Sequence, residues 1–321
     1  QIIRKEGDRS VSVVFTIVEN EKRKISKIIF EGNKNISDKK LIKEMETAPW
    51  RFWRFWSKRS RYRPAVLEED LNNLRSAYRD EGFLDVAIEQ SGVKIIPAGK
   101  GSLDMVINVA EGERSYFGEI AIVGNSVITT EDLRSLDNRG DKELKTGGFY
   151  SPTLLAEERS RLRKKYGKKG YLDARVISIR KPNLKTGQID LRFEITENNK
   201  FMVNSIQVRG NDKTKTTAIV RELALAPGET FDLVRMETSE ARLRNTRFFE
   251  KVTLDDEPIA SQDPELQSSR RNLVVNVEEG RTGHVSFGVG FSTLEKAMMF
   301  AEFRQGNFDI MRWRSPHRLQ G

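Results

Sequence analysis

The strongest constraint on the fold of this chain is an internal repeat. A strand-like phrase that ends in Gly-Asn occurs three times, as ISKIIFEGN, FGEIAIVGN and VNSIQVRGN, over residues 25–33, 117–125 and 203–211. Apolar alternation predicts a β-strand, and Gly-Asn is typical of a turn because both residues tolerate positive φ. Because apolar positions coincide in all three copies, the chain is predicted to consist of tandem copies of one small unit.

Two helices are predicted after this turn in each copy. The first follows a Ser/Thr-containing stretch that can supply an N-cap, and its buried side begins at Leu41, Leu133 or Ile219. The second shows apolar residues at helical spacing, most clearly in the first copy. Its expected buried residues are Leu67, Leu71, Leu74 and Tyr78, then Leu155, Leu162 and Tyr166, then Met236 and Leu243.

Two strands are predicted after the helix pair. The second helix ends at EGFLDVAI, KGYLDARVISI or RFFEKVTL, where the first two copies carry a Gly suited to a C-cap and the third carries Arg247. A polar loop (97–102, 181–188 or 255–272) then precedes an alternating strand that ends in an acidic phrase. Each unit is therefore predicted as β-α-α-β-β, an α+β fold with two helices on one face of a three-stranded sheet.

The acidic phrase also gives the domain boundaries. Its glutamates, Glu19, Glu111, Glu197 and Glu279, lie 92, 86 and 82 residues apart. We expect complete repeats at 22–113, 114–200 and 201–281. Residues 1–21 are expected to be the tail of a preceding unit, because 11–22 repeats the last strand, and residues 282–321 follow a different pattern.

The repeated unit resembles the POTRA (polypeptide-transport-associated) domains of outer-membrane β-barrel assembly factors of the BamA kind. The resemblance rests on the GN turn, on the phrase Y-x-x-x-G-[FY]-L-D that begins at Tyr78 and at Tyr166, and on the closing V-x-E-G. It implies a non-enzymatic role: receiving unfolded outer-membrane proteins, delivering them for insertion, and docking accessory lipoproteins. It also implies a location at the outer membrane, with these repeats in the periplasm.

The resemblance further implies where a client would bind. In POTRA folds the second strand lies at a sheet edge, which here corresponds to residues 84–89, 172–179 and 249–254. An extended client can add to such an edge through main-chain hydrogen bonds with little demand on its sequence. The residues expected along these edges are Leu84, Val86, Ile88, Leu172, Ala174, Val176 and Val252.

The segment after the third repeat is similar to the opening of the barrel in this family. GHVSFGVGFST alternates apolar with small or polar residues, and KAMMFAEFRQGNF follows as a returning strand. An ordinary soluble hairpin has the same pattern, and the position after POTRA-like units favours the barrel. We therefore expect a truncated β-barrel from residue 282 and a reading frame that continues past Gly321.

One basic aromatic segment is not required by the fold. Residues 50–63, WRFWRFWSKRSRYR, hold six basic residues, six aromatic residues and no acid, and contribute most of the chain's net charge of +9. The segment can contact outer-membrane lipid, or its rings can pack between neighbouring repeats, and we give these two hypotheses equal weight. Single-stranded nucleic acid ranks last, because no basic stripe occurs elsewhere. The residues concerned are Trp50, Arg51, Phe52, Trp53, Arg54, Phe55 and Trp56.

Signatures of catalysis and metal binding are weak. The chain has no Cys and two His, which argues against thiolate and multi-His metal sites, and we expect no cofactor. Ser37-x-x-Lys40 with a KTG at 145–147 imitates a serine-enzyme pattern, but SDN is missing. Two alternatives stay open: a POTRA region of a two-partner-secretion or import transporter, and a nucleic-acid-binding repeat protein that uses the basic aromatic segment.

Overall fold

The structure is a computed structural model. It describes residues 2–3, 12–13, 23–50, 58–99, 101–135, 143–183, 186–280, 283–292 and 296–305. The described residues within 1–120, 144–155 and 180–191 form one compact unit, and those within 121–143, 156–179 and 192–321 form another.

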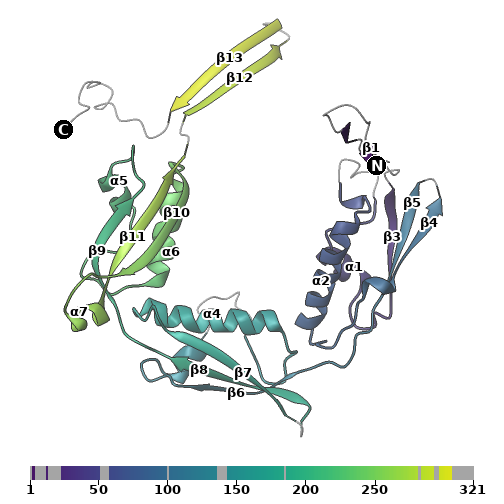
Figure 1. The fold of residues 1–321 in the computed structure, drawn as a ribbon, viewed down its shortest axis with the longest axis horizontal. Coiled ribbons are helices and arrows are strands. Elements are labelled where there is room, and N and C mark those ends of the chain that lie inside the picture. The colour runs from purple at the N-terminus through teal and green to yellow at the C-terminus, as the bar shows by residue number, and fades with distance from the viewer. Residues whose placement is uncertain are drawn as a thin grey trace. The chain divides into compact units, whose positions relative to one another are not determined.

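The first repeat has the predicted element order. It contains β3 (Lys24–Glu31), α1 (Asp38–Glu44), α2 (Pro64–Asp80), β4 (Val93–Gly99) and β5 (Ser102–Asn108). The sheet order is β3-β5-β4, in which β5 runs parallel to β3 and antiparallel to β4. Both helices lie on one side of this sheet (Figure 1). The last strand in sequence is therefore the central strand in space.

The second and third repeats follow the same order. The second contains β6 (Phe117–Val123), α3 (Thr130–Arg134), α4 (Pro152–Lys168), β7 (Arg175–Asn183) and β8 (Gln188–Thr196). The third contains β9 (Met202–Arg209), α5 (Thr216–Arg221), α6 (Leu233–Asn245), β10 (Phe249–Pro258), α7 (Pro264–Ser269) and β11 (Arg270–Glu279). Their sheet orders are β6-β8-β7 and β9-β11-β10, so the fold class predicted from the repeat is confirmed.

The core sits between the helices and one face of each sheet. Every apolar helix residue predicted to be buried is buried, from Leu41 of α1 to Leu243 of α6. The central strands contribute the opposite wall, with Leu103, Met105 and Ile107 of β5 buried in the first repeat. Burial of alternate strand residues against a helical stripe accounts for the two periodicities in the sequence.

The Gly-Asn turn has the same backbone role in all three repeats. Gly32, Gly124 and Gly210 have φ of 94°, 83° and 85°. A Cβ at these positions would lie 2.1, 2.2 and 2.0 Å from a carbonyl oxygen of the segment that ends the central strand. The side-chain amide of the following Asn donates to a backbone carbonyl three residues later, at 2.9–3.1 Å. Only Gly allows this close approach, and Asn then fixes the loop before the first helix.

The junction between the second helix and the second strand has the same left-handed backbone conformation in all three repeats, although the third repeat has a different residue there. Gly82 and Gly170 have φ of 95° and 91°, and Arg247, which replaces Gly in the third repeat, has φ of 59°. The third repeat therefore keeps the left-handed C-cap at some cost in backbone strain. The predicted Ser/Thr caps hold in part: Thr129 accepts from the Asp132 N–H, whereas Ser37 makes no cap hydrogen bond and Lys215 is the N-cap of α5.

The second strand of the first repeat was predicted in the wrong place. Residues 84–89 form turns and one isolated bridge, and the strand is β4, which begins at Val93. Val86 and Ile88 are buried in the core, and the Arg75 guanidinium donates to the Ile88 carbonyl, with 2.9 Å from Nε. Their alternation reflects this packing rather than a strand. The predicted loop 255–272 is also too long, because β10, α7 and β11 occupy most of it.

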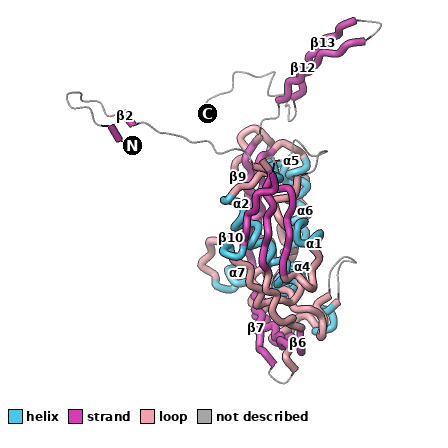
Figure 2. Tube along the Cα trace, turned by 90° about the vertical axis from the view of Figure 1, so that its right-hand side faces the viewer, coloured by secondary structure: helices cyan, strands magenta, loops and turns pink. Residues whose placement is uncertain are grey.

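Two pairs of strands lie outside the three sheets. β1 (Ile2–Ile3) pairs with β2 (Ser12–Val13). β12 (Gly283–Ser292) pairs with β13 (Lys296–Gln305) as an antiparallel hairpin, as the returning-strand pattern predicts (Figure 2). Phe287, Met299 and Phe303 of this hairpin are 80%, 85% and 71% exposed.

Candidate functional site

Each three-stranded sheet has two edge strands, and the second-position strands β4, β7 and β10 are one of the two in each repeat. β4, β7 and β10 each have a neighbour on one side in their sheets, namely the central strand of the repeat. This is the edge position that the resemblance implied for the second strand. The outward N–H and C=O groups of such a strand can pair with an added strand.

The edges of β4 and β10 are less suited to strand addition. β4 contains Pro97, which has no N–H to donate, and its pairing with β5 is irregular between Pro97 and Gly99. β10 has a bulge between Phe249 and Lys251 and ends in Asp255, Asp256, Glu257 and Pro258. Proline, bulges and charge are the devices by which proteins protect sheet edges.

The edge of β7 also carries charge, at Arg175, Arg180 and Lys181, but its proline lies near one end. Its single proline, Pro182, is the residue before the last, so Arg175 to Lys181 form a run free of proline. Ile177 and Ile179, at alternate positions of this run, are 56% and 43% exposed. An apolar stripe beside open backbone groups suits an added strand with alternating apolar residues.

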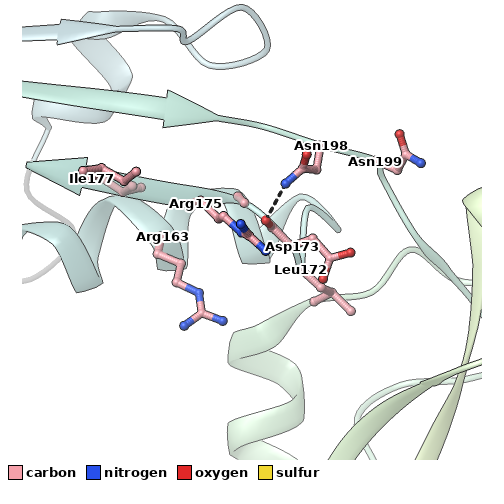
Figure 3. Close-up of a pocket in the computed structure, with 9 residues that line it drawn as sticks. Arg163, Leu172, Asp173, Arg175, Ile177, Asn198 and Asn199 are labelled. Carbon is pink, nitrogen blue, oxygen red and sulfur yellow. Dashed lines mark hydrogen bonds between the residues drawn. The ribbon is translucent and has the colours of Figure 1, made fainter.

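A pocket of about 870 Å³ opens at the start of β7 (Figure 3). It is lined by Arg163, Leu172, Asp173, Ala174, Arg175, Val176, Ile177, Asn198 and Asn199. Arg163 comes from α4, Arg175 to Ile177 from β7, and the two asparagines from the segment after β8. The pocket is therefore continuous with the β7 edge.

The walls of the pocket are fixed by hydrogen bonds and packing. The Asn198 side-chain amide donates to the Asp173 carbonyl at 2.8 Å, and Asn198 adopts a left-handed φ of 54°. The Asp173 carboxylate pairs with Arg271, whose guanidinium also pairs with Asp256 and lies 4.0 Å from the centre of the Phe201 ring. Leu172 packs against the apolar cluster of the third repeat. The one acid of the pocket thus already has a cationic partner.

A glutamate at the end of each central strand holds the turn of its own repeat. Glu197 accepts from the N–H groups of Ser126 and Val127 at 2.8 and 2.9 Å and from the buried Tyr166 hydroxyl at 2.8 Å. Glu111 accepts from Asn35, and Glu279 from the N–H groups of Lys213 and Thr214. We call this arrangement the glutamate latch.

The latch changes the acidity of its members. Burial acts to raise the pKa of Glu197, but the hydrogen bonds from Ser126, Val127 and Tyr166 together lower the pKa below its usual range. The pKa of Glu111 and that of Glu279 are lowered by hydrogen bonds in the same way. Burial, followed by the bond to Glu197, raises the pKa of Tyr166. The latch therefore stabilises the charged carboxylate.

Three segments of this chain match the model of one known protein family. The family model described as POTRA, surface antigen variable number repeat, matches residues 23–112, 115–198 and 201–280. The chain belongs to the POTRA family. Each matched segment includes one three-stranded sheet, one glutamate latch, and an edge strand that is the second strand of its repeat in sequence.

Relatives with this POTRA arrangement are considerably longer. A Treponema pallidum protein with the provisional name outer membrane protein assembly factor is 29% identical over 308 residues, which cover 93% of this chain and 35% of that protein. Outer membrane protein assembly factor BamA of Neisseria meningitidis is 24% identical over 305 residues, covering 95% and 37%. The chain thus spans little more than a third of the length of these relatives.

Solved structures share the POTRA fold. The Haemophilus influenzae BamA structure of POTRA 3–5 superposes with a TM-score of 0.56 at 20% identity, covering 82% of this chain and all of that one. The Haemophilus ducreyi BamA structure that lacks POTRA domains 1–3 gives 0.51 at 22% identity, covering 60% and 34%. At this identity the likeness concerns the fold alone.

The structure places some of the predicted edge residues within the edge strands and others outside them. Val176 lies in β7 and Val252 in β10, but Val252 is buried in the core. Leu172 and Ala174 precede β7, where Ala174 is buried and its N–H donates to the Tyr171 carbonyl. Leu84, Val86 and Ile88 lie outside the strand. Arg175 and Ile177 fall within the predicted edge range 172–179 but were not among the residues named along it. Arg163 of α4, which lines the pocket, was missed, because the repeat pattern gives no signal for it.

The predicted aromatic contact lies almost wholly outside the described residues. Arg51, Phe52, Trp53, Arg54, Phe55 and Trp56 are in that undescribed part. Trp50 is described, is 41% exposed, and has the Lys24 ammonium 4.9 Å from its ring centre. The flanks are held together by a hydrogen bond of 3.0 Å from the Ala48 N–H to the Arg59 carbonyl.

Within the described ranges, no group of three or more His, Cys, Asp or Glu side chains is arranged to hold a metal ion. Among the helices that the structure describes, none is both long and apolar enough to cross a membrane.

Proposed function

We propose that these POTRA repeats act in outer-membrane protein assembly, where they receive extended segments of unfolded barrel proteins at the β7 edge and pass them on for insertion. The family membership and the BamA relatives support the process, and the open β7 edge supports the mechanism. The location that goes with it is the periplasmic side of the outer membrane, with accessory lipoproteins as further partners.

The observation that carries this proposal is the contrast among the three edges. β7 alone of the second-position strands combines a proline-free run with exposed Ile177 and Ile179. Strand addition uses backbone groups that every client shares, so it suits a receiver of many unfolded proteins. Weak binding with little sequence selectivity is the expected result.

Proline substitution within β7 should remove client binding. Successive N–H groups of a strand point to opposite neighbours, so of Val176→Pro and Ile177→Pro one removes a donor to β8 and the other a donor to the added strand. We expect the variant that removes the donor to the added strand to keep its melting temperature within a few degrees. The same variant should bind extended barrel-derived peptides at least about five-fold more weakly. Fluorescence anisotropy with labelled peptides measures the loss.

Ile96→Pro in β4 is the matched control for the β7 substitution, because it places a second proline in an edge that already contains Pro97. It should leave peptide affinity unchanged. Full affinity in both β7 variants would remove strand addition at β7 from the proposal.

We assign the β12–β13 hairpin to the opening of a membrane barrel. The pairs Val285 with Phe303, Phe287 with Ala301 and Val289 with Met299 place apolar side chains on one face. Val285 and Val289 are exposed, as are Phe287, Met299 and Phe303. An apolar face of this kind suits lipid, and its two open edges would need further strands in hydrocarbon.

The basic aromatic segment is proposed to touch the anionic membrane surface. The hydrogen bond from the Ala48 N–H to the Arg59 carbonyl joins its described flanks, and Trp50, the one ring of WRFWRFW that the structure describes, is exposed. We expect tryptophan fluorescence to shift to the blue when vesicles containing anionic lipid are added, and the shift to disappear when Trp50, Trp53 and Trp56 are all changed to Ala. An unchanged spectrum, with rings shielded from a soluble quencher, would favour packing between repeats.

A further inference from the structure

We propose that the pocket beside β7 binds a carboxylate of the client strand, so that the preferred client carries an acidic residue next to alternating apolar residues. The inference rests on the proposed strand addition at β7 and adds a side-chain preference to it. Arg163 and Arg175 are the residues that would contact the carboxylate.

The charge balance of the pocket favours an anion. Arg163, Arg175 and Asp173 are its charged residues, and the Asp173 carboxylate is engaged by Arg271. Neither Arg163 nor Arg175 forms an ion pair or side-chain hydrogen bond with another residue in the described part of the chain. Two unpaired guanidinium groups therefore line one opening, and guanidinium groups bind carboxylates with charge-assisted hydrogen bonds.

The two cations approach the same opening from different elements. Arg163 projects from α4 and Arg175 from the first residue of β7 (Figure 3). Both are exposed, so a client strand can reach them without a change in the core. The Asn198 side-chain amide, which donates to the Asp173 carbonyl, and the Asp173–Arg271 ion pair hold another wall of the pocket in place. The client carboxylate thus meets a preformed site.

The register of β7 predicts a pattern in the client. Arg175, Ile177 and Ile179 alternate along the strand and share one face. Residues of an added strand on that face lie opposite or diagonal to them. A carboxylate beside Arg175 then places the client's next two alternate residues beside Ile177 and Ile179. The preferred segment is acidic at one end and apolar at the second and fourth residues from it.

A symmetric peptide tests this preference in either strand direction. The probe is the labelled heptapeptide Glu-Thr-Val-Thr-Val-Thr-Glu, and its twin carries Gln in place of both Glu. We expect the Glu peptide to bind the full chain about five- to ten-fold more tightly than the Gln twin at low salt, and the ratio to fall in 0.5 M (about 4 Å Debye length) salt. Anisotropy titrations give both affinities.

Substitution of the two arginines identifies the site. The double variant Arg163→Gln, Arg175→Gln should bring the affinity ratio of the two peptides close to one. Arg159→Gln, on an exposed residue of α4 that does not line the pocket, is the matched control and should keep the ratio. Circular dichroism of each variant verifies that the fold is retained.

The outcomes separate this inference from the function on which it rests. Equal binding of both peptides to the unsubstituted chain, with loss in the β7 proline variant, overturns the carboxylate site and leaves strand addition intact. A preference that persists in the double arginine variant also overturns the assignment. If neither peptide binds the unsubstituted chain, both proposals fail.

Discussion

Gly124→Ala is expected to unfold the second POTRA repeat, with a loss of at least about 3 kcal/mol in its free energy of unfolding. The new Cβ would lie 2.2 Å from the Ile195 carbonyl oxygen. Neither atom can move away by rotation of a side chain, because the Cβ is attached to the Cα and the oxygen belongs to the backbone. The residue would also keep a φ of 83°, which L residues rarely adopt. Relief requires the turn to separate from the central strand.

Gly187→Ala is the matched control for this loss. Gly187 belongs to the same repeat and has φ of 67°, but a Cβ there would meet nothing within 4 Å. It should therefore cost only about 1 kcal/mol, which is the effect of the left-handed conformation by itself. Hydrogen exchange read by mass spectrometry on peptides of each repeat compares the two variants, and equal protection in both would contradict the close-approach explanation.

Glu197→Ala is expected to give the second large effect, a loss of about 2 to 3 kcal/mol. The substitution removes the acceptor of the Ser126 and Val127 N–H groups and leaves the buried Tyr166 hydroxyl without its partner. Water can replace the acceptor for the N–H groups, which lie near the surface, and less readily for the hydroxyl. Urea unfolding followed in the second repeat by hydrogen exchange measures the loss.

Two further variants locate the cause of the Glu197 effect. Glu194→Ala, in the same strand β8, should cost much less, because the Glu194 side chain makes no hydrogen bond in the described residues. In a Tyr166→Phe background Glu197→Ala should also cost less, because no hydroxyl is then left unpaired. Additive losses for Tyr166→Phe and Glu197→Ala would contradict the latch.

The same latch predicts acid sensitivity. The pKa of Glu197 is lower in the folded state than the value of about 4.3 in an unfolded chain, so the unfolded state takes up protons first as the pH falls. The stabilisation is complete well above that pH and is lost as the pH falls through the lowered pKa. Since Glu111 and Glu279 shift in the same direction, all three repeats should weaken together below about pH 4.

The sequence by itself determined the unit and its core. Three copies of one pattern gave the order of the elements, and the helical spacing of residues such as Leu67, Leu162 and Leu243 identified buried positions correctly. These features follow from local periodicity, because a residue's place on a helix or strand fixes which side it presents. Glycine at the turn was also evident, although its reason, contact with the central strand, was not.

Tertiary structure decided which residues lie along the edge strands and what surrounds them. The alternation at Val86 and Ile88 resembles a strand, but both side chains are buried in the core and Arg75 donates to the Ile88 carbonyl. The strand β4 begins later, at Val93. The pocket brings Arg163, Arg175 and Asn198 together from a helix, a strand and a loop. No short-range pattern records such a meeting, because it depends on the last strand of the repeat entering the centre of the sheet and leaving β7 at its edge.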